Sequence, residues 1–162
     1  MKWDKLGDEP CSFARALSVL GDRWTLMILR DSFLGVRRFE EFQARLGISK
    51  AILTARLRSL TAEGVLFRIA YHSRPARQEY RLTAKGLDLY PVMLAMVDWG
   101  NTYMSGDEVP PVAHRHRKCG RDFKPVMTCS ECGEPLEPRE ISVLPGAGFP
   151  DPRAQRFREE GE

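Results

Sequence analysis

The spacing of proline along this chain of 162 residues sets the strongest limit on its fold. No proline lies between Pro10 and Pro75, whereas eight of the eleven prolines follow residue 104. Because proline interrupts helices, the first part of the chain can be mainly helical and the last part cannot. We therefore expect a compact domain over residues 1–104, a separate extension over 105–145, and a flexible tail over 146–162 that has too little apolar content to fold alone.

Capping residues and glycines divide the stretch without proline into short helices. Ser12, Asp22 and Ser49 each precede an apolar periodic segment and can cap it. Gly21 and Gly47 stand where such segments end. The second segment is apolar on nearly every side, as a central buried helix requires. The expected helices cover residues 13–20, 23–32, 37–46 and 50–63.

The segment over residues 50–63 has two chemically different faces. At 100° per residue, Leu53, Leu57 and Leu60 form one narrow apolar stripe. Small, polar and cationic side chains occupy the other side, where bulky ones would hold a helix off the floor of the major groove. Together with the short helix before it, this segment predicts a helix-turn-helix. The residues of the outward face are Ala51, Thr54, Ala55 and Arg58, with Lys50 at its flank.

Two strands and a further helix are expected after that segment. Residues 65–71 and 78–82 have strand character, and the connection over 72–77 suits an exposed hairpin tip. Thr83 can cap a last helix over 83–103, which has more apolar residues than one buried stripe needs. This excess predicts a partner surface, most simply a second copy of the chain. The fold class expected is α+β: mainly α, with a small β-wing.

Basic residues are concentrated in one part of the chain. Residues 37–85 contain eleven Lys and Arg against four Asp and Glu, although the whole chain carries only +3. Such a segment is typical of a surface that binds phosphates. A solvated helix face is the alternative that charge alone leaves open.

A set of short motifs is spread over residues 11–100, and its members are Cys11, Gly21-Asp22-Arg23-Trp24, Arg37-Arg38-Phe39, Gly47-Ile48-Ser49, Leu53, Arg56-Leu57, Glu79-Tyr80, Thr83, Gly86 and Trp99-Gly100. With these motifs the chain strongly resembles the HxlR-type branch of the MarR-like winged-helix transcriptional regulators of bacteria. The resemblance covers residues 11–100 and implies a homodimer that binds operator DNA, more often as a repressor, and responds to a small-molecule or oxidant signal. Ser12 departs from the family, which usually has proline there.

Three groups of residues are candidates for DNA contact. The outward face of the helix over 50–63 is expected to contact base edges, and Ser49 a phosphate. Basic residues before the preceding helix and in the wing are expected to contact the backbone or the minor groove. Arg56 projects beside the apolar stripe, and an ion pair is its alternative role. The candidates are Arg37, Arg38, Ser49, Lys50, Ala51, Thr54, Arg58, His72, Arg74 and Arg77.

Cys11 has two possible roles. It precedes a helix N-terminus, where the helix dipole favours the reactive thiolate, and some relatives in the resembled family sense oxidants or electrophiles at this position. A lone cysteine is more commonly a small buried residue.

The extension contains two pairs of metal-ligand residues. His116 and Cys119 precede Gly120, and Cys129 and Cys132 precede Gly133. Each pair has the spacing of a zinc knuckle, and two knuckles form a Cys3His site with a structural role. The expectation is a zinc-ribbon-like segment. His114 is the substitute for His116, and a Cys129–Cys132 redox pair is the alternative.

The remaining features exclude several classes of protein. No apolar run reaches the roughly 18 residues of a membrane span, and MKWDKLGDEP lacks the apolar stretch of a secretory peptide. We therefore expect a cytoplasmic protein. No phosphate-binding glycine loop and no Ser/His/Asp set is recognisable, so we expect no enzyme. The alternative function is a thiol- or zinc-based redox protein that uses the winged helix as a platform for protein interactions; it would not need the excess of arginine.

Overall fold

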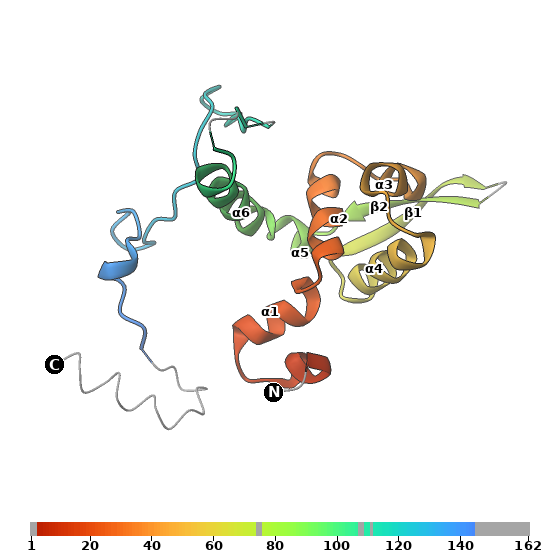
Figure 1. Ribbon diagram of the computed structural model, residues 1–162, viewed down its shortest axis with the longest axis horizontal. Helices are drawn as coiled ribbons and strands as arrows, with labels where there is room; N and C mark the ends of the chain where they lie inside the picture. The colour runs from red at the N-terminus through yellow and green to blue at the C-terminus, as the bar shows by residue number, and fades with distance from the viewer. Residues whose placement is uncertain (1–2, 74–75, 107–108, 111, 145–162) are drawn as a thin grey trace. The chain divides into compact units, whose positions relative to one another are not determined.

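The computed structural model describes residues 3–73, 76–106, 109–110 and 112–144 (Figure 1). The chain forms two compact units, Met1–Tyr90 and Pro91–Glu162. The expected domain boundary near residue 105 stays a prediction. The expected tail over 146–162 lies outside the described residues.

The first unit begins with the 3-10 helix η1 (Trp3–Asp8) and the helices α1 (Ser12–Leu20) and α2 (Arg23–Phe33). Asp22 caps α2 as expected, because its side chain accepts hydrogen bonds from the backbone N–H groups of Trp24 (2.9 Å) and Thr25 (3.2 Å). The start of α1 differs from the expectation. Cys11, not Ser12, is its N-cap, because the carbonyl of Cys11 accepts the first helical hydrogen bond from Arg15 N–H (3.0 Å).

The expected helix-turn-helix consists of α3 (Phe39–Leu46) and α4 (Lys50–Ala62). Helix α3 starts two residues later than expected, because the Glu41 carboxylate accepts the N–H groups of Arg37 (3.3 Å) and Arg38 (3.1 Å) outside the helix. Gly47 ends α3 with a φ of +64°, a left-handed conformation that glycine adopts without strain. Ser49 then caps α4 by accepting the N–H of Ile52 (3.3 Å).

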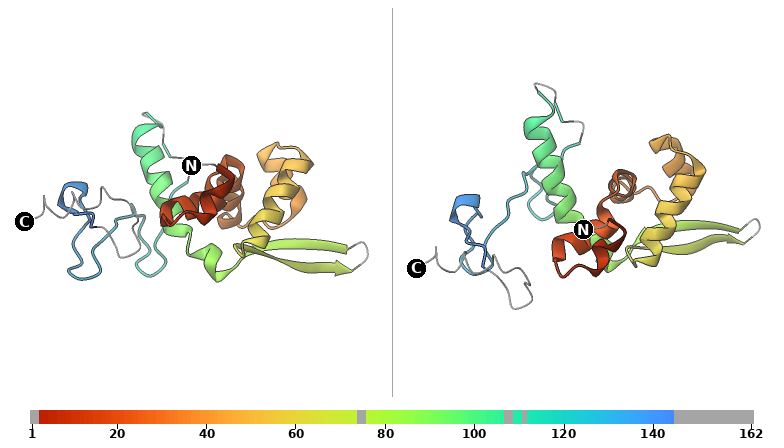
Figure 2. Two further views of the ribbon diagram at one scale, coloured as in Figure 1. Left: turned by 90° about the horizontal axis from the view of Figure 1, so that it is seen from below. Right: turned by 60° about the horizontal axis from the view of Figure 1, so that its bottom comes forward.

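The wing is an antiparallel hairpin of β1 (Leu66–Ser73) and β2 (Ala76–Leu82), which extends away from the helices in both views of Figure 2. Both strands reach further toward the tip than the sequence indicates, since His72 pairs with Arg77 and Ser73 with Ala76. The register shifts between Ala70 and His72. The expected hairpin tip over 72–77 is therefore mostly strand.

The single helix expected over 83–103 is two helices, α5 (Ala84–Leu87) and α6 (Tyr90–Tyr103). Thr83 caps the first as expected, accepting the N–H of Gly86 (3.0 Å). The break precedes Pro91, which has no N–H to donate to the carbonyl of Leu87 and whose ring would clash there in a continuous helix. Proline fits instead in the first turn of α6.

The core of the first unit lies between α2, α3, α4 and the start of β1. Leu53, Leu57 and Leu60, the predicted apolar stripe of α4, are all buried. Phe42 of α3 and Ile28 and Leu29 of α2 are fully buried as well. This packing fixes which face of α4 is exposed.

Asp31 is a buried carboxylate that the sequence does not single out. Its side chain is 0% exposed and accepts hydrogen bonds from Arg30 of α2 (2.8 and 2.9 Å) and Arg45 of α3 (3.2 Å). The Arg45 bond joins residues fourteen positions apart. Asp31 thus connects α2 to α3, the first helix of the helix-turn-helix.

In the second unit, α6 continues into the extension. None of the residues of α6 is buried. The rings of Trp99 and Tyr103, whose centroids are 5.6 Å apart, are tilted against each other, and the two residues are 60% and 70% exposed. The described part of the extension contains tight turns and the short 3-10 helix η2 (Pro138–Glu140). Its large apolar side chains, Val126 and Met127 among them, are also exposed.

Candidate nucleic-acid interface

Helix α4 presents the face that the sequence predicts for base contact. Lys50, Ala51, Thr54 and Arg58 are all exposed, on the side opposite the buried leucine stripe. Alanine and threonine near the start of this helix leave room for close approach to base edges, and Arg58 can donate two hydrogen bonds to guanine. Ser49 is exposed beside them, although its hydroxyl oxygen already accepts the N–H of Ile52.

The wing adds two residues that sequence reasoning missed. A hollow of about 290 Å³ lies between α4 and the hairpin, lined by Thr54, Arg58, Arg68 and Tyr80 among others. Arg68 of β1 is exposed and pairs in register with Tyr80 of β2. The alternation of side chains along a strand indicates that Arg68 lies on one face, but only the packing of the hairpin beside α4 brings Arg68 to the same hollow as Arg58.

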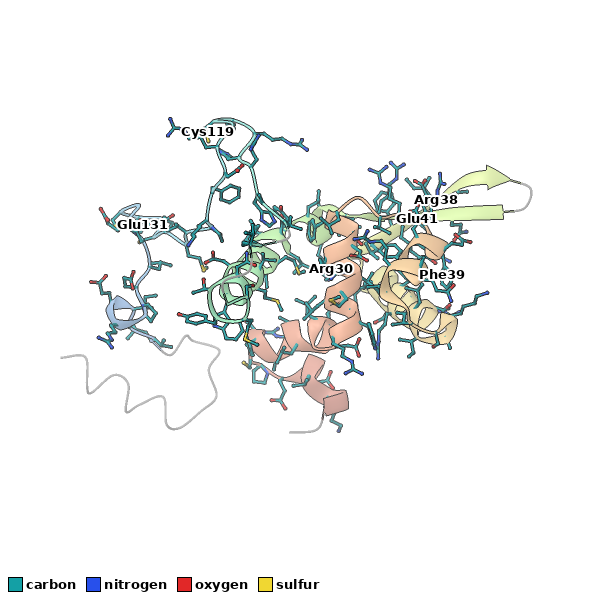
Figure 3. The ribbon with its side chains drawn as sticks, turned by 45° about the horizontal axis from the view of Figure 1, so that its top comes forward. Arg30, Arg38, Phe39, Glu41, Cys119 and Glu131 are labelled. Atoms are coloured by element: carbon teal, nitrogen blue, oxygen red, sulfur yellow. The ribbon has the colours of Figure 1, made fainter. Side chains whose placement is uncertain are left out.

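Arg37 and Arg38 lie between the wing and the start of α3, where Figure 3 labels Arg38, Phe39 and Glu41. The Arg37 carbonyl accepts the N–H of Tyr80 (2.8 Å), and Arg38 is 3.6 Å from a carboxylate oxygen of Glu79. Both arginines are exposed. Their contact with the DNA backbone stays a prediction.

Glu79 partly compensates the arginines around it. A hydrogen bond from Arg81, with the nearby charges of Arg81 and Arg38, holds the pKa of Glu79 below its usual value. The carboxylate is therefore ionised at neutral pH. It fixes Arg38 beside the wing but also reduces the positive charge there.

Arg56 has the structural role that its projection beside the apolar stripe suggested. Its guanidinium is 3.0 Å from the carboxylate of Asp22, the residue that caps α2. This ion pair joins α4 to the N-terminus of α2. Of the two neighbouring arginines of α4, Arg58 is therefore the candidate for DNA contact.

The structure describes two of the three wing residues that are predicted to contact DNA. His72 and Arg77 lie opposite each other in β1 and β2, at the end of the hairpin away from α5. Arg74 lies outside the described residues. The backbones of His72 and Arg77 are therefore paired, and contact of this part of the wing with DNA stays a prediction.

Cys11 and the four predicted zinc ligands belong to other parts of the chain than α4. Cys11 is exposed at the N-terminus of α1 and its side chain makes no capping hydrogen bond, so it is not a core residue of the first unit. His116 and Cys119 form one close pair, with Nδ1 and Sγ 3.4 Å apart. Backbone N–H groups of Cys132 and Glu131 donate to the Cys129 sulfur and lower the pKa of that thiol. Among the described residues, no three His, Cys, Asp or Glu side chains are gathered closely enough to hold one metal ion.

A helix-turn-helix with an exposed small and basic face, next to a hairpin that bears arginine, defines a winged-helix DNA-binding protein. The family model of the HxlR-like helix-turn-helix matches residues 19–108. An uncharacterized HTH-type transcriptional regulator of Mycobacterium tuberculosis (strain H37Rv) is 44% identical over 138 residues, which are 85% of this chain and 87% of the relative. The chain therefore belongs to the HxlR-like family of transcriptional regulators, which are not enzymes.

Solved structures of related proteins have the same fold. The crystal structure of the protein PA1607 matches with a TM-score of 0.75 and 38% sequence identity, covering 85% of this chain and 96% of that one. The redox regulator HypR in its reduced form matches with a TM-score of 0.54 and 34% identity, covering 57% of this chain and 92% of that one. The expectation of a winged helix is thus confirmed. Within the part of the chain that the structure describes, no helix is long and apolar enough to cross a membrane.

Proposed function

We propose that this regulator binds operator DNA in the bacterial cytoplasm as a homodimer and acts as a repressor. The exposed face of α4, with Arg58 and Arg68 on one hollow beside the wing, is the observation that supports this proposal. Base edges are contacted by Lys50, Ala51, Thr54 and Arg58, and phosphates by Arg37, Arg38 and Ser49. The wing residues His72, Arg74 and Arg77 contact phosphates or the adjacent minor groove.

The apolar side chains of α6 support the dimer. Val92, Met96 and Trp99 are 47%, 48% and 60% exposed, although an exposed apolar stripe of this kind is costly in water. The simplest way to bury these side chains is to pack them against α6 of a second copy of the chain. In such a dimer the two α4 helices enter successive major grooves about 34 Å apart on a roughly palindromic site.

Cys11 is the candidate for receiving an oxidant or electrophile signal. Its exposure at a helix N-terminus supports this role, and the similar protein HypR is a redox regulator. Modification of the thiol next to α1 would release the operator.

The decisive experiment compares two arginines of the same helix. Arg58→Ala removes the guanidinium from the hollow and should cost about 1 to 3 kcal/mol of operator binding, which is roughly a 5- to 150-fold loss, with relaxed base preference at one position. Arg56→Ala is the matched control: it breaks the partly exposed pair with Asp22 and should cost about 1 kcal/mol of folding stability or less. The Arg56 variant should keep the base preference of the parent.

The operator fragments come from mapping the bound sites across the organism's own genome, and binding is followed by fluorescence anisotropy. Sedimentation of the same samples at micromolar concentration should show a dimer. Arg58→Ala binding as tightly and as selectively as the parent would place the base contacts elsewhere. A stable monomer that binds one half-site with full affinity would refute the dimer.

A further inference from the structure

Two consecutive stretches of the extension, residues 114–126 and 127–139, have the same backbone hydrogen bonds. In the first, His116 N–H donates to Arg121 C=O (2.9 Å) and Gly120 N–H to His116 C=O (2.8 Å). Thirteen residues later, Cys129 N–H donates to Glu134 C=O (2.8 Å) and Gly133 N–H to Cys129 C=O (2.9 Å). The two stretches are therefore a structural repeat.

The repeat extends to the residues that flank each turn. Phe123 N–H donates to His114 C=O (3.0 Å), and at the equivalent positions Leu136 N–H donates to Met127 C=O (2.9 Å). Each turn is closed by an isolated antiparallel bridge, Arg115 with Asp122 and Thr128 with Pro135. The amino-acid sequences of the two stretches are identical at only three positions, which are Cys119/Cys132, Gly120/Gly133 and Pro125/Pro138.

Each turn places two ligand-type side chains at its ends. His116 and Cys129 occupy the first position, and Cys119 and Cys132 the second. The glycine that follows has a φ of +69° in one turn and +77° in the other, values that glycine adopts without strain. The chain thus builds the same tight turn twice around residues of the kind that bind zinc.

The spacing of atoms in the first turn fits a metal site. Nδ1 of His116 and Sγ of Cys119 are 3.4 Å apart. Zinc bonds of about 2.3 Å to sulfur and about 2.0 Å to nitrogen at tetrahedral angles place those two atoms about 3.5 Å apart. In the second turn, backbone N–H groups of Cys132 and Glu131 donate hydrogen bonds to the Cys129 sulfur.

Packing does not explain why these turns form. Phe123 and Leu136, at equivalent positions, are 39% and 40% exposed, and Val126 and Met127 are more exposed still. So short a segment without a buried core needs a metal or a disulfide to be stable. The charges favour bringing the turns together, because residues 114–126 contain five Lys and Arg with one Asp, and residues 127–139 contain three Glu with one Arg.

We propose that the two turns are the halves of one structural zinc site, with Nδ1 of His116 and the sulfurs of Cys119, Cys129 and Cys132 as its four ligands. Three thiols lose their protons when one Zn²⁺ binds, and the four-coordinate site then carries a charge of −1, which the lysines and arginines of the first half offset. No position is left for water, so the ion holds the extension together and catalyses nothing. Zinc content does not depend on DNA binding, so this proposal and the proposed function fail separately.

The first test measures zinc in the full, reduced chain, purified without chelator or affinity tag and dialysed after addition of Zn²⁺. Elemental analysis should find about one zinc per chain. Cys119→Ser and Cys129→Ser, one from each half, should each lose most of it. Cys11→Ser removes a thiol outside the site and should keep the zinc of the parent. His116→Ala should lose zinc, whereas His114→Ala, two residues away, should retain it.

A second measurement needs no variant and is therefore independent of any folding defect. Alkylation of the reduced parent with and without Zn²⁺, read by peptide mass spectrometry, should show protection of Cys119, Cys129 and Cys132 and none of Cys11. A parent chain that retains no zinc overturns the proposal. Protection of Cys129 and Cys132 alone, or zinc retained in Cys119→Ser, also overturns it, because the first half would then take no part.

Discussion

Replacing Asp31 by asparagine should destabilise the first unit more than any exposed substitution of similar chemistry. The change keeps the size of the side chain but removes its charge and turns one acceptor oxygen into a donor NH2 group. At that site one oxygen accepts two hydrogen bonds from Arg30 (2.8 and 2.9 Å), and the other accepts one from Arg45 (3.2 Å). The new NH2 group would face an arginine donor in a position with no solvent access.

The solvent exposure of Arg30 and Arg45 sets how much stability the Asp31→Asn substitution should cost. Breaking a fully buried ion pair costs about 3 to 5 kcal/mol, because the remaining charge stays buried without a partner. Here the Arg30 and Arg45 side chains are 39% and 49% exposed, so water can solvate them again after the substitution. We therefore expect a loss of about 2 to 3 kcal/mol in the free energy of unfolding, above the value for losing one neutral hydrogen bond.

Urea unfolding followed by circular dichroism and tryptophan fluorescence measures this loss. Glu40→Gln is the control, since Glu40 is an exposed carboxylate in the first turn of α3 and should cost no more than about 1 kcal/mol. A double-mutant cycle of Asp31→Asn with Arg45→Gln should give a coupling energy on the order of 1 kcal/mol. If Asp31→Asn unfolds at the same urea concentration as Glu40→Gln, or the coupling with Arg45 is zero, the carboxylate does not join α2 to α3 as we infer.

Two further predictions concern substitutions of Gly86 and Cys11. Gly86→Ala should lower the free energy of unfolding by about 1 to 3 kcal/mol, because the added Cβ would overlap the backbone carbonyl oxygen of Val65 and crowd Leu82. An unchanged urea midpoint would show that this contact of α5 with Val65, the residue before β1, can relax freely. Cys11→Ser should bind the operator like the parent but no longer release it on treatment with hydrogen peroxide, since an exposed serine hydroxyl keeps the space of the thiol without its reactivity. Equal release of DNA by the parent and the serine variant, measured by anisotropy, would remove Cys11 from sensing.

The sequence by itself determined the local features of the first unit. Asp22, Ser49 and Thr83 cap the helices that they were expected to cap, because a short polar side chain satisfies backbone N–H groups of its own first turn and needs no distant partner. The leucine stripe of α4 is buried for a similarly local reason, since the period of the helix sets which residues share a face. From that stripe the exposed face, with Arg58 on it, follows directly.

Tertiary structure decided what depends on partners far away along the chain. The sequence gives no sign that Asp31 is buried, because its partner Arg45 lies on another helix. The hollow that Arg68 shares with Arg58 depends on how the hairpin packs beside α4. The sequence shows the two matching ligand pairs of the extension, but the full length of the repeat around them appears only in its backbone hydrogen bonds, because a turn is defined by its N–H and C=O pairing and tolerates different side chains at most of its positions.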